Sequence, residues 1–470
     1  MTTSAPKTRL PVVKEQASSL HSDGRRNHVH PADVSGRHVK GRYVVFFVLI
    51  LIWAALPWVQ VGGHPALYLD IANRHFYLFG STFNAQDAWL VFFLLSGAGL
   101  TTMLVTTIWG RIWCGWACPQ TVFMEGVFRR IERYVEGPRN KRLRRNAGPM
   151  TGEKFARKVV KHVLFILAAL LISHIFLSFF VSMPSLVAMV QTSPSENPEA
   201  FAWMGAMTLL LYGNFAWFRE QLCLVICPYG RLQSVLTDKH SMVVGYDVER
   251  GEPRGKAKDP NAGDCVDCNR CVAVCPTGID IRNGLQLDCI GCTACIDACD
   301  SIMDKLKRPR GLVRYDSLAG IEGEPKRVFR PRLLLYTGLL LAWGVGAAFA
   351  FQGHDSFEAN LLRLRGAPYH LIEVDEVPVV RNLFQVHLVN KGGDTATFHL
   401  RALDAEGQSV RIAHEDVELG SMDGREIPVY VDVPADSVEP GQRLLIEVRR
   451  HGDPAEDAVR TEAPLLAPRR

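Results

Sequence analysis

The chain has 470 residues, which is too long for one ordinary domain. Its formal net charge is +5, and 48% of its residues are hydrophobic. The hydrophobic residues form long runs, and Lys and Arg cluster beside these runs instead of forming a patch with interleaved aromatic residues. The composition therefore indicates a membrane protein with soluble parts and argues against a nucleic-acid-binding function.

The chain begins with a polar segment, residues 1–40, that is rich in His, Lys and Arg. It has neither an apolar stretch nor a small-residue cleavage site, so it does not resemble a signal peptide. We predict a cytoplasmic tail, and we expect it to be mobile because chain termini usually are.

Five apolar segments each approach the roughly 20 residues that a helix needs to cross a bilayer. They are residues 43–61, 87–108, 159–181, 201–218 and 333–351. We therefore predict a membrane region of four helices within residues 41–235 and a fifth transmembrane helix within residues 319–352.

Loop charge predicts the orientation, because Lys and Arg collect in short cytoplasmic loops. Eight Lys or Arg residues lie between Arg129 and Arg145, whereas residues 182–200 contain none. The N-terminus and residues 236–318 are then cytoplasmic, residues 353–470 are periplasmic, and the chain is a multi-pass protein of a bacterial inner membrane. We expect the basic run to contact anionic lipid head groups.

Two cysteine runs of equal spacing follow one another within residues 236–318. The first is Cys265-Val-Asp-Cys268-Asn-Arg-Cys271-Val-Ala-Val-Cys275-Pro, and the second repeats its cysteine spacing from Cys289 to Cys299. In bacterial ferredoxins such a run gives three thiolates to one 4Fe-4S cluster and the fourth to the other. We therefore predict a ferredoxin-like domain with two clusters, the first held by Cys265, Cys268, Cys271 and Cys299 and the second by Cys289, Cys292, Cys295 and Cys275.

Two details qualify this prediction. Structural zinc sites usually pair two C-x2-C knuckles, so zinc fits the spacing less well than iron–sulfur clusters do. Asp300 follows Cys299 at a position where such ferredoxins commonly have proline. The local backbone there is expected to differ, but the ligands are not.

Two further cysteine pairs lie just after apolar segments. They are Cys114 with Cys118 and Cys223 with Cys227, and each pair belongs to a C-x3-C-P element. Both predicted spans run toward the cytoplasm, so we expect all four thiols at the cytoplasmic face of the membrane. If the residues before each proline are helical, the two cysteines of a pair share one helix face.

These four thiols admit several chemistries. They suit Cu(I) or an iron–sulfur cluster, and a pair with a low pKa could carry out dithiol redox chemistry. Ordinary buried cysteines are the simplest alternative. His174, within the third apolar segment, is a candidate metal ligand or proton relay, although a neutral histidine bonded to a neighbouring helix explains it equally well.

The last part of the chain, residues 353–470, alternates apolar and polar residues in short stretches. These stretches are residues 384–389, 396–400, 427–433 and 444–448, and a turn is expected at 390–393. The pattern predicts an Ig-like β-sandwich without a disulfide. No cluster of titratable residues stands out in it, so we expect a docking or stabilising domain.

Taken together, the motifs resemble the cytochrome c oxidase accessory protein family, known as CcoG, FixG or RdxA. The resemblance is carried by Leu56-Pro-Trp58, Gly110-Arg-Ile-Trp-Cys-Gly-Trp-Ala-Cys-Pro-Gln-Thr121, Cys227-Pro-Tyr-Gly-Arg231, Cys295-Ile-Asp-Ala-Cys-Asp300 and Gly311-Leu-Val-Arg-Tyr-Asp316. It covers nearly the whole chain beyond the tail. The family has aspartate after its last cluster cysteine, so Asp300 departs only from generic ferredoxins.

The resemblance implies that the protein reduces Cu(II) to Cu(I) for assembly of a cbb-type haem-copper oxidase. An unknown cytoplasmic donor would supply the electrons, and copper-handling assembly proteins would be partners. The catalytic copper site would lie at Cys114, Cys118, Cys223 and Cys227.

Two other functions stay open. One is a quinol dehydrogenase that passes electrons to a periplasmic reductase, and the other is a non-catalytic copper-binding assembly scaffold. A homodimer would suit so small a membrane bundle.

Overall fold

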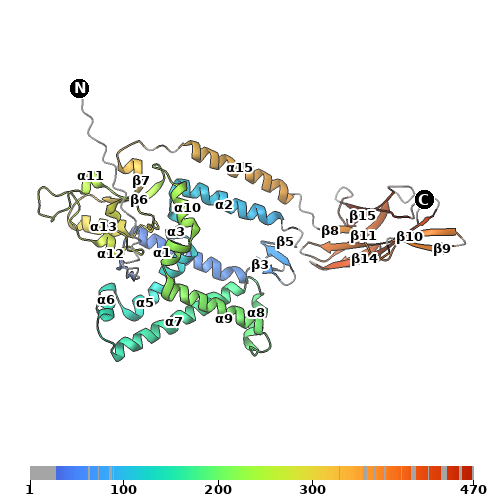
Figure 1. The fold of residues 1–470 in the computed structure, drawn as a ribbon, viewed down its shortest axis with the longest axis horizontal. Coiled ribbons are helices and arrows are strands. Elements are labelled where there is room, and N and C mark those ends of the chain that lie inside the picture. Colours follow the sequence, from blue (N-terminus) through green and yellow to red (C-terminus); the bar gives the residue numbers. More distant parts are fainter. Residues whose placement is uncertain are drawn as a thin grey trace, which may run out of the picture. The chain divides into compact units, whose positions relative to one another are not determined.

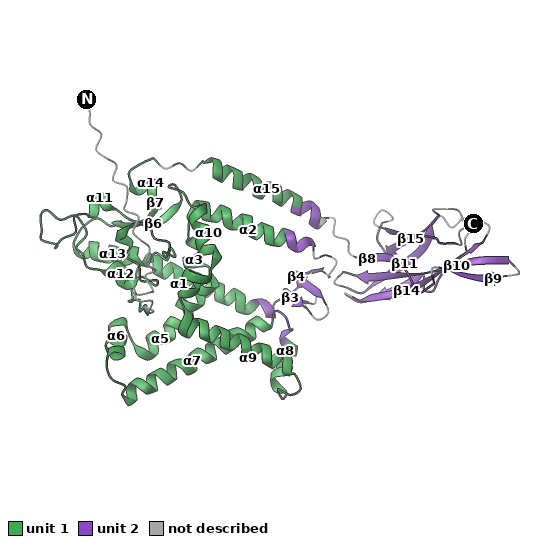
Figure 2. Cartoon of the chain, in the orientation of Figure 1, with its two compact units in different colours: residues 1–55, 93–178, 184–346 green, residues 56–92, 179–183, 347–470 purple. Residues whose placement is uncertain are grey.

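The structure is a computed structural model of the chain, and it describes residues 28–467 except for short internal gaps. The gaps are residues 62–63, 72–73, 84–86, 88, 326, 328, 353–356, 365, 368, 375–376, 393, 404–408, 422, 436–441 and 455–457. Most of the predicted tail, up to residue 27, therefore lies outside the described residues. The chain divides into two compact units (Figure 2). Unit 1 comprises Met1–Ala55, Phe93–Ser178 and Pro184–Gly346, and unit 2 comprises Leu56–Phe92, Phe179–Met183 and Ala347–Arg470.

Among the described residues, four helices are long and apolar enough to cross a membrane (Figure 1). They are α1 (Arg37–Ala55), α2 (Trp89–Trp109), α7 (Gly152–Leu177) and α15 (Pro331–Gln352). Long runs of Leu, Val, Ile and Phe leave most of their side chains exposed in the isolated chain, as lipid-facing helices require.

The fourth predicted span, residues 201–218, is helical over its whole length, but the helix changes type within it. Helix α9 (Pro198–Gly213) has 16 residues and continues into the π-helix η4 (Asn214–Phe218). The chain then turns at Arg219, whose φ is 54°, and the Arg219 guanidinium pairs with the buried Glu132. The pairing of this charge inside the protein ends the apolar helix. Helix α9 packs on α7, where Thr208 donates a hydrogen bond of 3.2 Å to Ser173.

The shorter helices of unit 1 connect the long ones. They are α3 (Ile112–Trp116), α4 (Pro119–Phe123), η3 (Met124–Phe128), α5 (Arg129–Glu136), α6 (Arg139–Ala147), α8 (Met183–Gln191), η5 (Leu222–Ile226) and α10 (Pro228–Leu236). A small aromatic core joins η3, η4 and α7: Phe128 stacks on Phe215 at 4.3 Å and meets Phe165 edge-on at 5.0 Å.

The cysteine-rich module, residues 236–318, is built around one antiparallel strand pair. Strand β6 (Met242–Tyr246) pairs with β7 (Val313–Ser317), so the two ends of the module meet. The helices between them are α11 (Val248–Gly251), α12 (Arg270–Val274), η6 (Ile281–Asn283) and α13 (Ala294–Lys305), and α14 (Leu318–Ile321) follows β7. Apolar residues of both strands and of α13 form its core with the cysteines.

The described end of the predicted tail, residues 28–36, packs on this module. The Ala32 amide donates a hydrogen bond of 2.7 Å to the Ala273 carbonyl, and Arg142 donates one of 3.3 Å to the Pro31 carbonyl. Helix α1 begins at Arg37, inside the range assigned to the tail. The expectation of a mobile tail is therefore wrong for these residues.

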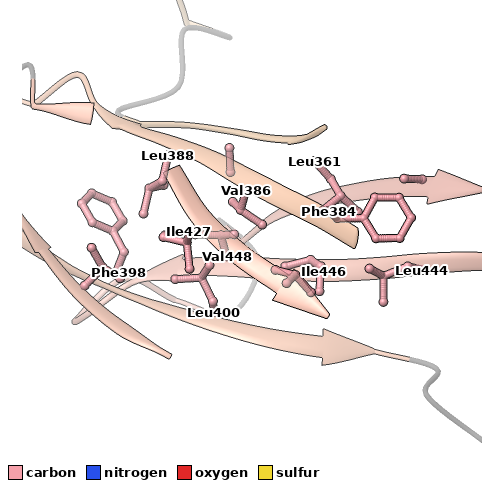
Figure 3. Close-up of a cluster of buried hydrophobic side chains, with 14 of the residues drawn as sticks. Leu361, Phe384, Val386, Leu388, Phe398, Leu400, Ile427, Leu444, Ile446 and Val448 are labelled. Carbon is pink, nitrogen blue, oxygen red and sulfur yellow. The ribbon is translucent and has the colours of Figure 1, made fainter. Parts of the chain in front are cut away.

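Unit 2 contains a two-layer β-sandwich, as the alternation predicted. One sheet has the order β12-β14-β10-β8, with β9 also on β10, and the other has the order β13-β11-β15-β16. The strands are β8 (Phe357–Arg363), β9 (His370–Val374), β10 (Val377–Asn390), β11 (Ala396–Leu403), β12 (Ser409–Ile412), β13 (Asp416–Leu419), β14 (Gly424–Pro434), β15 (Arg443–Arg450) and β16 (Val459–Pro464). Figure 3 shows Phe384, Phe398, Leu400, Ile427 and Ile446 filling the space between the sheets.

The strands on either side of the predicted turn at 390–393 lie in different sheets. Strand β10 pairs with β14, with Phe384 opposite Val429, whereas β11 pairs with β15, with Leu400 opposite Val448. The connection is therefore a crossover between the layers, and Gly393 itself lies outside the described residues. Unit 2 also contains the short strands β1 (Gln60–Val61), β2 (His64–Pro65), β3 (Leu67–Asp70), β4 (His75–Leu78) and β5 (Ser81–Phe83).

Candidate functional site

The eight cysteines of the module line two neighbouring cavities. The first cavity is lined by Cys265, Cys268, Cys271 and Cys299. The second is lined by Cys275, Cys289, Cys292 and Cys295, and Cys271 also lines it. Each set combines three cysteines of one run with the last cysteine of the other run, which is the crossed arrangement expected from the spacing.

The two cysteine loops share an unusual backbone. Asp267 and Asn269 have φ values of 50° and 54° in the first loop, and Gly291 and Thr293 have φ values of 65° and 61° in the second. These pairs stand two and four residues after the first cysteine of each run. Left-handed residues curl a short chain around its own centre, at a cost of order 1–3 kcal/mol for each non-glycine residue. Binding of a ligand inside the curled loop offsets this cost.

Arg282 supports the first loop. Its Nη1 donates a hydrogen bond of 2.6 Å to Asp267, its Nη2 bonds to the side-chain oxygen of Asn269, and its Nε donates one of 2.8 Å to Asp280. The side chain is 8% exposed. One arginine therefore fixes both left-handed residues of this loop.

Helix α13 carries Cys295 and Cys299 and continues past them to Lys305. Asp300 accepts a hydrogen bond of 3.0 Å from the Gly311 amide, which anchors the strand β7 side of the module to this helix. Proline at position 300 would lack an amide inside α13 and would cost about 3 kcal/mol. This contact is a local reason for aspartate at this position.

The donor set fits iron–sulfur clusters. Burial raises the pKa of the Cys271 thiol to about 11 and those of Cys292 and Cys299 to about 12. Such thiols stay protonated until a metal neutralises the thiolate charge and releases the proton. Eight sulfur ligands in two apolar cavities suit that chemistry and leave few alternative roles for these side chains.

The two membrane-edge cysteine pairs are not on shared helix faces. Cys118 and Cys227 have extended backbones, with ψ values of 127° and 111°, because each precedes a proline that begins a helix. Cys114 lies in α3, which ends at Trp116, and Cys223 lies in the π-helix η5. The residues before each proline are therefore not continuously helical, and the expectation that the two cysteines of a pair share one helix face is wrong.

The two pairs nevertheless meet, because their motifs pack on one another. Gln233 of α10 donates a hydrogen bond of 3.4 Å to the Cys114 sulfur. Gln120 of α4 donates one of 3.0 Å to the Arg219 carbonyl and accepts another of 2.7 Å from the side-chain amide of Asn214. These polar contacts hold the first motif against the second.

The four thiols influence one another electrostatically. Burial raises the pKa of Cys114 to about 12, and the charge of nearby Cys118 adds to this effect. Burial raises the pKa of Cys223 to about 12 as well, and the charges of Cys118, Cys114 and Cys227 contribute. The four sulfurs therefore gather in one region, as the internal repeat suggested.

This thiol site lies against the second cysteine loop. A Cβ atom on Gly115 would come within 2.8 Å of backbone atoms of Gly291 and Ile290, so the two backbones touch. Arg111 donates hydrogen bonds of 2.9 Å to the Cys289 carbonyl and 3.3 Å to the Gly230 carbonyl. A small cavity is lined by Cys223 together with Pro276, Thr277 and Ile290.

Several of these residues were not found from the sequence alone. Arg111 stands three residues before Cys114 and Gln233 six residues after Cys227, but only the fold shows that both link the motifs. His174 was a candidate ligand, and its Nδ1 lies 2.8 Å from the Leu170 carbonyl of its own helix. Among the described residues, no group of three or more His, Cys, Asp or Glu side chains is arranged to hold a single metal ion.

Three family models match this chain. Residues 90–145, which contain the first membrane-edge pair, match a 4Fe-4S binding domain, and residues 218–318 match a 4Fe-4S dicluster domain. Residues 347–468 match the Ig-like fold at the C-terminus of FixG. Both iron–sulfur matches therefore include cysteines of the two sites described above.

Three curated proteins are similar over most of their length. Nitrogen fixation protein FixG of Rhizobium meliloti is 34% identical, with 91% of this chain and 89% of that protein covered. Protein RdxB of Cereibacter sphaeroides is 35% identical, with 96% and 94% covered, and protein RdxA of the same organism is 33% identical, with 92% and 94% covered. With its apolar helices and its iron–sulfur domains, the chain is a membrane iron–sulfur electron-transfer protein, and it belongs to the FixG/RdxA family.

Proposed function

We propose that this protein reduces Cu(II) to Cu(I) at its membrane-edge thiols, for assembly of a cbb-type cytochrome c oxidase. The observation that supports this most is the backbone contact between Gly115 and Gly291, which joins the four-thiol site to the second cysteine loop. The cysteine-rich module and the four thiols thus belong to one continuous structure. The copper substrate itself is inferred from the family resemblance.

The two cysteine sets would hold the clusters in the crossed pattern given above. A bound 4Fe-4S cluster supplies one-electron transfer. Cys268 is exposed, whereas Cys265 and Cys271 are buried, so the first cavity is the one that a soluble electron donor can approach. The second cavity adjoins the thiol site. This arrangement of the two cavities favours electron entry at the first cavity, beside Cys268, and electron exit from the second cavity to the thiols at the membrane edge.

The thiols would bind copper and favour its reduced state. Thiolate ligands prefer Cu(I), so they make the reduction of Cu(II) more favourable. Each Cu(II) takes up one electron, which a reduced cytoplasmic donor must supply. Because burial raises the pKa of Cys114 and Cys223, copper binding there releases protons and weakens as the pH falls. Copper-handling assembly proteins would then accept Cu(I).

We also propose the topology expected from loop charge. The basic connection between α2 and α7 would lie in the cytoplasm with the cysteine-rich module, and the β-sandwich would lie in the periplasm. Protease added to spheroplasts should then cleave within residues 353–467 and spare the module, and inverted vesicles should give the opposite result.

The function is tested with full-length protein purified without oxygen. We expect many Cu(II) ions to be reduced per chain, as measured with a Cu(I) chelator and a chemical electron donor. The rate should fall at least tenfold in Cys114→Ala/Cys118→Ala and in Cys223→Ala/Cys227→Ala, while iron stays near the value for two clusters, about eight per chain. If the wild type instead contains four irons more than either variant, the thiols hold a third cluster and not copper.

Stoichiometric reduction, or reduction that is equal in all variants, would contradict a copper reductase. Stoichiometric binding without turnover would favour the scaffold function. Equal rates in the variants would place copper reduction elsewhere on the chain.

One observation favours quinol oxidation as a second candidate. A cavity of about 280 Å³ adjoins Cys289 and is lined by apolar residues together with Arg111, Ser234, Thr237 and Tyr315. Tyr315 donates a hydrogen bond of 2.5 Å to the carbonyl of Trp109, the last residue of α2, so this cavity lies close to a membrane helix end. A quinol there would release two protons as it gives up two electrons. If decylubiquinol reduces the clusters without copper, and Val243→Phe in the cavity wall abolishes this, the quinol function holds.

A further inference from the structure

A second site lies in unit 1, where arginines gather around a cavity of about 110 Å³ that none of the four membrane-edge cysteines lines. Five arginines line it, and only two carboxylates, Asp33 and Glu125, accompany them. The arginines are Arg42, Arg129, Arg130, Arg133 and Arg142. The cavity is thus strongly positive, and it lies where the start of α1, helices α5 and α6 and the cysteine-rich module meet.

Most of the carboxylates near the cavity already form ion pairs with arginines. Asp33 pairs with Arg133 at 2.8 Å, and Glu125 pairs with Arg129. Arg142 pairs at 3.1 Å with Glu132, which also binds Arg219. Within the part of the chain that the structure describes, Arg42 and Arg130 have no carboxylate partner. Glu220 also lies 3.5 Å from Arg129. Positive charge still remains at the cavity after these acids have been assigned.

Three of the arginines also have buried donors without a partner. These donors are Nη2 of Arg42 and Nε of Arg129 and of Arg142, and the three side chains are 3%, 9% and 5% exposed. A buried donor that makes no hydrogen bond costs roughly 1–3 kcal/mol. Three such donors around one cavity are unusual in a folded protein unless a bound anion or ordered water satisfies them.

The neighbouring cysteines do not remove this excess. Arg42 lies close enough to Cys292 to offset part of the rise that burial causes in its pKa, so an iron–sulfur cluster would balance part of the charge of Arg42. Arg42 also donates a hydrogen bond of 2.7 Å to the Gly115 carbonyl. The orphaned donors of Arg129 and Arg142 would still be unpaired. Arg130 would keep its stacking position over the Tyr43 ring, 3.8 Å from the centroid, without a counter-charge.

Size and chemistry together identify the ligand class. The cavity is far smaller than the roughly 300–1,000 Å³ of sites for drug-sized molecules, so a nucleotide does not fit inside it. The planar fork of arginine matches the paired oxygens of a phosphate group, and basic pockets at membrane-helix ends accept phospholipid head groups.

We propose that this arginine cavity binds a phosphate group, carried by an anionic phospholipid head group or by free inorganic phosphate. The bound phosphate would accept hydrogen bonds from the orphaned guanidinium donors after small side-chain rotations. It would also tie α5 and α6 to the cysteine-rich module and to the residues before α1, because Arg129 and Arg142 already donate to the Pro276 and Pro31 carbonyls. This site is independent of copper reduction.

The test uses the full-length protein with its iron–sulfur content intact. Arg130→Gln/Arg133→Gln removes two charges from the cavity, and the control Lys141→Gln/Arg144→Gln removes two exposed charges from the same basic run outside it. Binding of inorganic phosphate is measured by calorimetry, and retention of phosphatidylglycerol is measured by native mass spectrometry in detergent.

We expect one saturable phosphate-containing ligand per chain, bound at least tenfold more weakly by the cavity variant and unchanged in the control. Retained phosphatidylglycerol that phosphate does not displace identifies the lipid as the source, and saturable binding of phosphate alone identifies the free anion. The absence of saturable binding in the wild type, or equal weakening in both variants, overturns the proposal. If the double variant loses iron, Arg130→Gln is compared with Arg144→Gln under the same criteria.

Discussion

At the scale of single residues, Glu132 organises the membrane-proximal part of unit 1. It is 2% exposed and binds Arg219, Arg142 and, at 3.9 Å, Lys161. Burial alone would raise the pKa of this carboxyl, but the charge of Arg219 and the other cations lowers it to about 2. A buried acid is thus kept ionised by three partners that come from different parts of the chain: α6, α7 and the turn after η4.

Replacing Glu132 by Gln should therefore destabilise the protein by about 3–5 kcal/mol, because it leaves Arg219 and Arg142 charged and buried without their partner. Thermal unfolding in detergent at neutral pH measures this. The control Glu153→Gln removes an exposed ion pair with Arg157 and should leave the midpoint unchanged. Equal midpoints for wild type and Glu132→Gln would show that the network does not stabilise the fold.

The pKa of the Glu132 carboxyl also predicts how the stability of the protein changes with pH. Its pKa is about 2 in the folded protein and 4.5 ordinarily, so the folded state binds the proton less readily than the unfolded state. The stabilisation by Glu132 is complete above about pH 4.5 and is lost as the pH falls toward 2. The stability difference between wild type and Glu132→Gln should shrink over that range and stay constant from pH 5 to 7.

At the scale of elements, the membrane helix α1 is capped by the cysteine-rich module. Asp297, on α13 between Cys295 and Cys299, accepts hydrogen bonds of 2.8 Å from the Val39 amide and 3.4 Å from the His38 amide. Asp297 thus accepts hydrogen bonds from the amides at the start of α1 that have no partner within the helix. An N-cap residue usually does this, but Asp297 comes from a distant part of the chain. The close approach leaves room only for glycine at position 36, where a Cβ atom would lie 2.1 Å from the Asp297 carboxyl carbon.

Asp297→Ala should lower the free energy of unfolding by about 1 kcal/mol, as the loss of a helix cap usually does, and should loosen the start of α1. Hydrogen exchange of the Val39 and Lys40 amides measures the loosening directly. Asp297→Asn keeps an acceptor and should restore most of the protection, while iron content stays unchanged in both variants. Protection that is equal in Asp297→Ala and the wild type would show that the cap is unimportant.

The elements differ in how well the sequence predicts them. Apolar runs and alternation predict the long helices and the sandwich strands, and cysteine spacing predicts which thiols share a cavity, because these signals are local. The ion pair of Arg219, the cap of α1 and the sheet change between β10 and β11 depend on partners far along the chain. Glu132 with Arg219, and Asp297 with Val39, are contacts that no local pattern shows.

At the scale of the whole molecule, the separate β-sandwich should fold independently of the redox module. Phe398 is fully buried between the sheets, so Phe398→Ala should destabilise unit 2 by about 3–5 kcal/mol. Limited proteolysis should then remove residues 353–467 more readily, while the iron content and the absorbance of the clusters stay at their wild-type values. Loss of iron in this variant would show that the two units fold as one.

The proposed redox route within unit 1 depends on one close backbone contact. A side chain on Gly115 would meet Gly291 and Ile290 backbone atoms at 2.8 Å, and real Cβ atoms do not approach backbone so closely. Gly115→Ala should therefore push the Cys114 motif away from the second cysteine loop. The matched control is Gly213→Ala in α9, where the added methyl group meets nothing within 4 Å.

We expect Gly115→Ala to slow electron transfer from the reduced clusters to copper at least tenfold and Gly213→Ala to leave it unchanged. Stopped-flow reoxidation of the prereduced protein by Cu(II) measures this rate, and iron content and cluster potentials verify that both cofactor sites are intact. Because the substitution lengthens only the gap between the two sites, a normal rate in Gly115→Ala would mean that electrons leave the module by another face. The 280 Å³ cavity beside Cys289 would then be the exit to examine.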